Sequence, residues 1–386
     1  MKKILGAVPT PFWFYFLPML AGTFGLIPQS HPLYPFLSSQ LLPVCLVLLL
    51  IGTDLRAVAR MGGLSFFLML SGMAGTVLGG IVSYRLYQPW LPPGTWGGIG
   101  ALAGSWTGGS ANMIAVKEAL QVPDSIIGPL IIVDAGVAYS WMALLVWSSS
   151  LQERWNAWVA NGDVPPSGRV NAVRSSSQRD DSLYRLARSR LETSSQANRA
   201  RSLGEAGFSR APQVAVAIAL SLSISLAAQF ISRRLPTPGP AFSTSTWTVI
   251  LVTTAALILS LTPLRKLEEA GVSRLGTWAL YLLLASIGAR ADLRAILHTP
   301  VFLALGVTWV LIHGLCLLAA GRLLRAPLGL IAVASQANIG GTVSTPIVGA
   351  TFSPELAGIG LLMAILGNLL GTYIGLATAL MVRKLV

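Results

Sequence analysis

The sequence predicts an all-α membrane protein with about eleven transmembrane helices in two structural repeats. Of the 386 residues, 53% are hydrophobic and 11% are charged, and the mean hydropathy is +0.67. Soluble domains carry about 25% charged residues. Apolar runs of roughly 18 or more residues recur along the chain, and about 20 helical residues cross the hydrocarbon of a bilayer. Similar segments in the two halves predict the repeats.

The apolar runs can be taken in order along the chain. The first begins after MKK and shows no small-residue cleavage site before further runs follow, so we expect a membrane span rather than a signal peptide. Many of the eleven tryptophans lie near the ends of runs, which suits anchoring at the membrane interface. The predicted spans are 10–27, 38–53, 62–88, 95–120, 124–148, 212–232, 244–263, 274–289, 300–322, 326–347 and 355–383.

The net charge of +13 does not describe a nucleic-acid-binding surface, because the basic residues lie between apolar runs and act there as topology signals. Cys45 and Cys316 lie inside apolar segments, which favours packing over a disulfide or a metal site. No nucleophile elbow, metal-ligand cluster or phosphate-binding loop stands out in the sequence. We therefore expect no enzyme and no cofactor other than a coupling ion.

A segment of different composition separates the fifth and sixth spans. Residues 149–211 contain ten arginines, no lysine and six acidic residues, with many serines. Such a composition cannot bury a core, so we expect a disordered or loosely helical linker; contact with anionic lipid headgroups is the alternative. The domains are then a first transmembrane repeat (1–148), the linker (149–211) and a second repeat (212–386). With a cytoplasmic linker, eleven spans place the N-terminus outside and the C-terminus inside, although charges in the short loops barely decide this.

Matching segments recur in the same order in the two halves. LLLIGTDLRAVAR (48–60) parallels LLASIGARADLRAILH (283–298), and SWTGGSANM (105–113) parallels ANIGGTVST (337–345). Order and spacing are kept over about 100 residues, which indicates an internal duplication. The alignment pairs Gly108 and Gly109 with Gly340 and Gly341, Ser110 with Thr342, and Asn112 with Ser344.

The paired glycines interrupt two apolar runs. Lipid cannot satisfy unpaired backbone groups, so such breaks persist only inside protein or beside a water-filled cavity. In transporters built from repeats, discontinuous helices meet near the middle of the bilayer, and their free ends bind substrate or ions. The alternative is close packing of glycines between helices, with hydroxyls bonding their own backbone. The residues expected to line such a site are Gly108, Gly109, Ser110, Asn112, Asn338, Gly340, Gly341, Thr342 and Ser344.

One acidic residue, Asp134, lies inside an apolar run, IIGPLIIVDAGVAYSWMALLVW. An ionisable group at that depth costs about 2.5–3.5 kcal/mol on insertion scales and is by default a functional candidate. Asn368 takes the corresponding place in the second half, which leaves a site with one titratable group. We expect Asp134 to bind a coupling cation, Na⁺ or H⁺; the alternative is a hydrogen bond that only supports packing.

Other polar residues suggest structural roles. Asp54 and Asp292 directly follow spans and lie near arginines, which predicts local ion pairs or helix caps. Lys117 and Glu118 close the fourth span, where we expect them to face water. His313 lies alone within a span, and an interhelical hydrogen bond is the ordinary role of such a residue.

Several of these motifs resemble a known family. LLPVCLVLLLIGTDLRAV, AGSWTGGSANMIAVKEAL and WALYLLLASIGARADLRA, followed by ASQANIGGTVSTP and GNLLGTYIG, resemble the DUF819 membrane proteins, over nearly the whole chain apart from 149–211. That family is placed in the group of cation/proton antiporters and anion transporters. The resemblance implies a core domain, a panel domain for dimerisation, and two broken helices that cross in the core. In sodium/proton antiporters the helix after the first crossing helix bears ion-binding acids, and Asp134 falls there.

The orientation of the repeats stays open from the sequence. The fourth and tenth spans correspond and are six apart, so simple alternation gives them the same orientation. The resemblance implies inverted repeats, which need an odd separation. Either one segment is miscounted, or one folds back as a re-entrant pair, or the duplication is not inverted.

Together these features predict a secondary transporter in a bacterial inner membrane. It would move a small ion or an organic anion, coupled to Na⁺ or H⁺ through Asp134, by movement of the core against the panel. Its partners would be the substrate, membrane lipid and a second copy in a homodimer, with no nucleic acid. The alternatives are a membrane-embedded enzyme, for which no catalytic constellation assembles, and a scaffold that recruits partners through its linker.

Overall fold

The computed structural model describes residues 10–59, 61–160, 211–237, 242–291 and 300–385, and every regular element in these ranges is a helix. By length and composition, seven of the described helices could cross a membrane, or eight if one bent pair counts as a span. The described residues therefore form an all-α, multi-pass membrane protein, as predicted.

Seven of the eleven predicted spans coincide with these long helices. The first is Leu33–Leu50, made of α3 (Leu33–Phe36), the π-helix η1 (Leu37–Leu41) and α4 (Leu42–Leu50). The others are α6 (Gly63–Tyr87) with the 3-10 helix η2 (Gln88–Trp90), α9 (Asp124–Ser148), α12 (Ala211–Ser232), α14 (Val272–Arg290), α16 (Val301–Leu323) and α19 (Pro354–Arg383).

The other four predicted spans do not coincide with a long, straight helix. The prediction of eleven simple membrane crossings is therefore wrong. Two are short: α2 (Thr10–Thr23) has 14 residues, and α13 (Thr244–Ser260) bends by 95° into the 3-10 helix η4 (Pro263–Ala270). The other two, 95–120 and 326–347, are interrupted at their glycine pairs. Length alone therefore overestimates the number of crossings.

The fourth predicted span is a helical hairpin. α7 (Thr95–Gly108) ends at Gly109, whose φ is +85°, and α8 (Ser110–Ala119) returns beside it. A left-handed φ is readily adopted only by glycine. A Cβ on Gly97 would lie 2.9 Å from Val122, just beyond the end of α8, whereas two collinear helices of this length would hold these residues about 35 Å apart. The predicted break is present, but the segment folds back instead of crossing.

The tenth predicted span is a second hairpin. α17 (Leu328–Ile339) and α18 (Gly341–Phe352) meet at Gly341, whose φ is +69°. A Cβ on Gly329, near the start of α17, would lie 2.9 Å from Phe352, so the open ends of the hairpin are adjacent. Every residue of α17 is buried, and so is all of α7 except its second residue. Protein therefore surrounds the first helix of each hairpin, while the residues at the breaks, such as Gly109 and Gly340, are partly buried.

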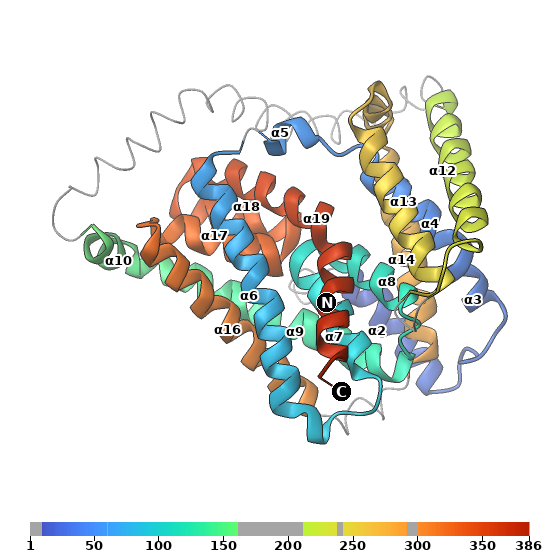
Figure 1. Cartoon of the computed structure of the whole chain (residues 1–386), viewed down its shortest axis with the longest axis horizontal. Coiled ribbons are helices and arrows are strands. Elements are labelled where there is room, and N and C mark those ends of the chain that lie inside the picture. The colour runs from blue at the N-terminus through green and yellow to red at the C-terminus, as the bar shows by residue number, and fades with distance from the viewer. Residues whose placement is uncertain (1–9, 60, 161–210, 238–241, 292–299, 386) are drawn as a thin grey trace.

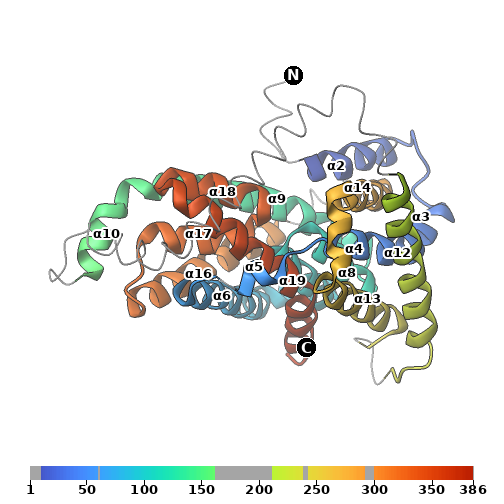
Figure 2. The same cartoon turned by 90° about the horizontal axis from the view of Figure 1, so that it is seen from above.

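The helices form two groups that lie side by side (Figures 1 and 2). The first group contains α2, α4, α12, α13 and α14; α14 packs on α2 and α4, and α12 packs on α13. The second group, called the hairpin group below, contains α6, α9, α16, α19 and the two hairpins; α16 packs on α6, and α19 packs on α7 and α18. The short helix α5 (Leu55–Ala59) follows α4 at one end of the molecule (Figure 1).

Glycines spaced four residues apart let α7 and α19 approach closely. A Cβ on Gly375 of α19 would lie 2.7 Å from the carbonyl oxygen of Gly100 and 3.1 Å from the Cα of Gly104. One turn earlier, a Cβ on Gly371 would lie 2.9 Å from the Cα of Gly108. Small residues at this spacing are typical of close helix contacts in membranes. Gly108 therefore has the packing role that was the alternative reading of the first glycine pair.

Gly367→Ala is expected to destabilise the protein by about 1–3 kcal/mol, because the new Cβ would clash with the backbone oxygen of Thr107. The measurement is thermal unfolding in detergent. Gly136→Ala in α9 is the matched control, since no heavy atom lies within 4 Å of its Cβ position. That change should be neutral or stabilise by about 0.5–1 kcal/mol, because alanine favours a helix interior. Equal losses in the two variants would contradict the packing argument.

Most of the predicted linker, residues 161–210, lies outside the described part of the chain. Its first residues are helical, as η3 (Ser149–Leu151) and α10 (Gln152–Val159). Trp155 of α10 donates a hydrogen bond of 3.0 Å to the carbonyl oxygen of Ala326, which follows α16. The start of this segment is therefore ordered and packed against the hairpin group.

Candidate functional site

Asp134, the acidic residue predicted to bind a cation, lies beside the first hairpin. It is half-buried in α9, and its Oδ2 accepts a hydrogen bond of 2.9 Å from the Oγ of Ser105. Ser105 belongs to α7, about one turn before the break at Gly109. Among the described residues, no basic side chain forms an ion pair with Asp134. The carboxyl group of Asp134 therefore lies near the hairpin tip with no countercharge among the described residues.

The tip of the first hairpin is tied to α19 by one asparagine. The Nδ2 of Asn112 donates to the carbonyl oxygens of Gly108 at 2.7 Å and Asn368 at 3.2 Å, and its Oδ1 accepts from Thr372 at 2.6 Å. Both N–H groups of this amide are therefore occupied. A Cβ on Gly109 would lie 3.7 Å from the side-chain oxygen of Asn368, so Asn368 faces the turn. The two predicted site residues Asn112 and Asn368 are brought together here.

The tip of the second hairpin holds two buried amides that are only partly paired. Asn338 donates from Nδ2 to the Sδ of Met69 at 3.3 Å, and its Oδ1 has no hydrogen-bond partner among the described residues. Gln336 donates to the Oγ of Ser344 at 2.7 Å, and its Oε1 is likewise unpaired within the described part of the chain. The Oγ of Ser344 donates to the backbone oxygen of Gly340 at 2.8 Å. Buried polar atoms are rarely left unpaired, so the two free amide oxygens suit a cation or a donor group.

The two tips approach each other on α6 and α19. Met69 of α6 contacts Asn338 at the second tip, and its Cε lies 3.0 Å from the Cβ position of Gly367, which touches Thr107 at the first tip. One side chain, Met69, therefore bridges the two hairpins.

The structure sorts the predicted site residues into two clusters and two outliers. Ser110 and Thr342 are half-buried, and their side chains form no hydrogen bond with the described residues. No hydrogen bond joins a side chain of one tip to a side chain of the other in the described ranges. Gly108, Gly109, Asn112, Asn368 and, through Ser105, Asp134 gather at the first tip; Asn338, Gly340, Gly341 and Ser344 gather at the second.

The sequence of the whole chain matches one protein family, described as "Protein of unknown function (DUF819)", over residues 1–385. The chain belongs to the DUF819 family. It is also 25% identical over 361 residues to the "Uncharacterized membrane protein YjcL" of Bacillus subtilis (strain 168), a match that covers 92% of this chain and 85% of that protein. No solved structure matches. The resemblance of the motifs is thereby confirmed, while the placement among antiporters and anion transporters stays a prediction.

His313 links four helices at the centre of this DUF819 protein. Its Nδ1 lies 3.0 Å from the backbone oxygen of Gly72 and 3.1 Å from the Oγ1 of Thr76, both in α6. Its Nε2 lies 3.1 Å from the Oγ of Ser335 in α17, which accepts a hydrogen bond of 2.8 Å from Trp141 of α9. One neutral tautomer satisfies these contacts, with Nδ1–H donating and Nε2 accepting. The predicted interhelical hydrogen bond is confirmed.

His313→Ala is expected to cost about 1–3 kcal/mol of unfolding free energy, because the polar groups that face the imidazole would stay buried without a partner. His31→Ala is the control: His31 is exposed in a loop, and its Nδ1 accepts one exposed hydrogen bond of 3.2 Å from the backbone N–H of Leu33, so this change should cost no more than about 1 kcal/mol. Thermal unfolding of both variants in detergent makes the comparison. A loss no larger at His313 than at His31 would show that the four-helix contact contributes nothing.

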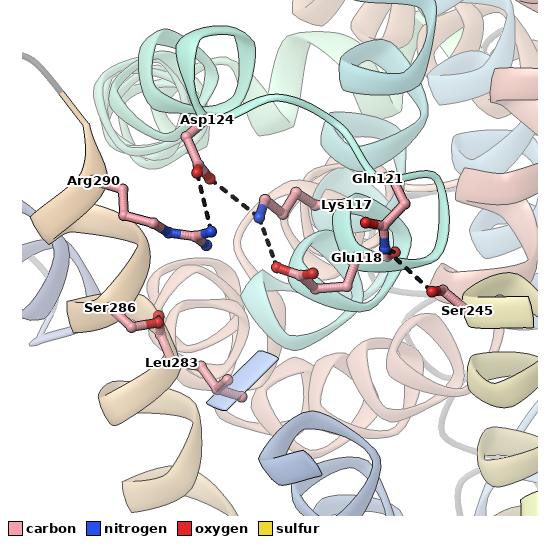
Figure 3. A network of polar contacts seen from close by, with 8 residues as sticks. All are labelled: Lys117, Glu118, Gln121, Asp124, Ser245, Leu283, Ser286 and Arg290. Atoms are coloured by element: carbon pink, nitrogen blue, oxygen red, sulfur yellow. Dashed lines mark hydrogen bonds and ion pairs between the residues drawn. The ribbon is translucent and has the colours of Figure 1, made fainter. Parts of the chain in front are cut away.

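A network of four charges in this DUF819 protein was missed by sequence reasoning (Figure 3). The Nζ of Lys117 lies 2.6 Å from Glu118 and 3.1 Å from Asp124, and Arg290 lies 3.2 Å from the other oxygen of Asp124. Lys117 is 4% exposed, so the expectation that it faces water is wrong. Two positive and two negative side chains compensate each other, which is how buried charges are retained.

This network ties the first hairpin to the first group of helices. Arg290 ends α14, whereas its partner Asp124 begins α9 directly after the hairpin. Nearby, Gln121 donates to Ser245 of α13 at 3.2 Å, and Thr246 donates to the backbone oxygen at the end of α8 at 2.8 Å. The open end of the first hairpin is therefore fastened to helices of both groups.

Of the two aspartates that directly follow predicted spans, the structure describes Asp54. Asp54 accepts a hydrogen bond from the backbone N–H of Ala57 at 3.1 Å and pairs with Arg265 at 2.9 Å. The expected helix cap is confirmed, whereas this ion pair is formed with a distant arginine instead of a local one. Asp292 lies outside the described residues.

Proposed function

We propose that this DUF819 protein is a secondary transporter of a small ion or an organic anion, coupled to Na⁺ or H⁺ through Asp134. The observation that carries the proposal is the pair of hairpins, each with a buried first helix, whose tips converge near a carboxyl group that has no countercharge among the described residues. A scaffold has no use for two interrupted helices inside its core. Broken helices that meet at membrane depth supply free backbone ends for a solute or an ion.

The polarity of the half-helices supports an ionic cargo. α7 and α17 end at the two tips, and α8 and α18 begin there. A helix N-terminus carries about +0.5 and a C-terminus about −0.5 of an elementary charge. Neither α8 nor α18 has a side-chain cap at its N-terminus. Each tip thus offers one pole that attracts an anion and one that attracts a cation.

The order of the helices supports inverted repeats. Between the two hairpins, the described residues contain five candidate spans: α9, α12, α13 with η4, α14 and α16. If each of them crosses the bilayer, the odd number places the hairpins on opposite faces. A hairpin returns to the face that it entered, so it adds no crossing of its own. The even separation of the fourth and tenth spans then no longer conflicts with inversion.

The two groups of helices suit the panel and the core of such a transporter. The hairpin group contains both tips and Asp134 and would be the core, and the first group would be the panel. The ion pair between Asp124 and Arg290 lies between them. We expect this contact to break when the core moves against the panel.

Charge displacement on a solid-supported membrane tests this function without knowledge of the substrate. Vesicles that contain the purified full-length protein are exposed to steps of Na⁺ and of pH. A transient current that requires the protein, and that saturates with cation concentration, is expected. Absence of any protein-dependent current in both kinds of step would overturn the coupling proposal.

A further inference from the structure

A cavity of about 520 Å³ lies between the two groups of helices. Its walls come from α5, the start of α6, Leu257 of α13, and a face of α19 made of Leu366, Leu369 and Leu370. All of the described residues that line it are apolar or glycine. Leu257 lies near the end of α13, whereas the hydrogen bonds of α13 with the open end of the first hairpin lie at its start. The cavity therefore occupies the opposite end of the seam between the groups.

Exposed apolar side chains lie beside the residues that line the cavity. Phe66, one of the lining residues, is 39% exposed, and the apolar side chains next to the cavity walls, Phe67, Ile258 and Leu261, are exposed as well. In Figure 1 the wall helices α6 and α13 stand on either side of α19, with α5 above them, and Figure 2 shows α19 between them from a second direction. An exposed apolar surface between membrane-spanning helices is covered by lipid, so hydrocarbon has direct access to this cavity.

The apolar lining of the cavity favours binding of a hydrocarbon chain over binding of a hydrated solute. An ion or a polar head would lose its water there and find no hydrogen-bonding side chain among the described lining residues, at a cost of several kcal/mol. Apolar atoms that fill the space gain about 25 cal/mol for each Å² removed from water, as well as dispersion contacts that an empty cavity forfeits. We propose that the cavity holds one acyl chain of a membrane phospholipid, inserted from the side between α6 and α13.

The proposed acyl chain would lie close to the first hairpin. The leucine face of α19 forms one wall of the cavity, and the opposite face of the same helix carries Asn368, which faces the turn of the first hairpin. A bound acyl chain would therefore lie between the two groups, one helix away from the first tip. This inference does not rest on the transport proposal, because it needs only the cavity and the surrounding bilayer.

Photolabelling tests the inference on the full-length protein in vesicles that contain a phospholipid with a diazirine at the end of one acyl chain. We expect labelled peptides to include the buried residues Leu366 and Leu369, in addition to exposed residues such as Leu226 and Leu315 that any surrounding lipid reaches. Labelling confined to the exposed residues would overturn the proposal.

Two glycines supply a matched pair of variants. Gly63 lines the cavity and Gly62 does not, and no heavy atom of the described residues lies within 4 Å of the Cβ position of either. Gly63→Trp should fill the mouth and abolish labelling of Leu366 and Leu369, while Gly62→Trp should leave it unchanged. Equal labelling in the two variants would contradict the site.

The accessibility of a cysteine introduced into the cavity is a second test, which does not depend on the tryptophan variants. With Cys45 and Cys316 replaced, Leu369→Cys is exposed to a water-soluble, membrane-impermeant thiol reagent. A cavity filled by an acyl chain predicts no reaction. Rapid reaction from either side of the membrane would show a water-filled passage and overturn the proposal.

Discussion

Asp134→Asn is expected to abolish the stabilisation of the purified protein by its coupling cation. The carboxyl group accepts a hydrogen bond from Ser105 and has no ion-pair partner among the described residues, so a bound cation would supply the missing charge. A ligand present at 100 times its Kd stabilises the folded state by about 2.7 kcal/mol. Thermal unfolding in detergent, across Na⁺ concentrations at fixed pH and across pH without Na⁺, measures this shift for each ion.

Two further variants make the result specific. Asp54→Asn removes an acid that is paired with Arg265 away from the hairpin tips, and it should keep the full cation-dependent shift. Ser105→Ala removes one donor to the carboxyl group of Asp134 and should weaken the shift without abolishing it. If Asp134→Asn behaves like Asp54→Asn, the acid has only a packing role, and the coupling function must be sought elsewhere.

Lys117→Met should produce the largest loss of stability among the charge variants. The side chain is 5% exposed and neutralises Glu118 and Asp124 together, so its removal leaves two acids with only the single guanidinium of Arg290. Breaking a buried ion pair from one side costs about 3–5 kcal/mol. Thermal or denaturant unfolding in detergent gives the value.

Two controls distinguish the loss of stability caused by a buried unpaired charge from the loss caused by breaking a more exposed ion pair. Arg265→Met breaks an ion pair of 2.9 Å whose side chains are 33% and 22% exposed, and such a pair contributes about 0–1 kcal/mol. The double change of Lys117→Met with Glu118→Gln removes one cation and one anion and should recover part of the loss. A Lys117→Met variant as stable as Arg265→Met would show that the network is solvated and carries no buried charge.

The sequence predicted where the helices break but not that the chain folds back after each break. The glycine pairs at Gly108 and Gly340, with short polar neighbours, signalled an interruption, and both interruptions exist. The direction after each break depends on one backbone angle, the positive φ of Gly109 or of Gly341. A glycine is compatible with either direction, so the fold-back could not be inferred from residue type. It needs the contacts that hold the open ends together, such as Gly329 against Phe352.

Hydropathy also could not distinguish a crossing helix from a buried one. α7 and α17 are apolar because protein surrounds them, and a count of apolar runs assigns them to the membrane-spanning set. The charge network was missed for a different reason. Arg290 comes from the second half of the chain and meets Asp124 only in three dimensions. The position of Asp134 was clear from its apolar surroundings, whereas its partner Ser105 lies on another helix and left no local signal.

The tight contact between α7 and α19 has a consequence for biogenesis. The first hairpin leaves the ribosome early, but the helix that covers its glycine face is the last one described, Pro354–Arg383. The earlier helix α6 already packs on α7, but the glycine face of α7 that Gly371 and Gly375 cover stays open to lipid until α19 arrives. Assembly of the membrane domain must therefore finish from its C-terminal end, and a nascent chain released before Pro354 would present an uncovered hairpin to the proteases that survey the bilayer.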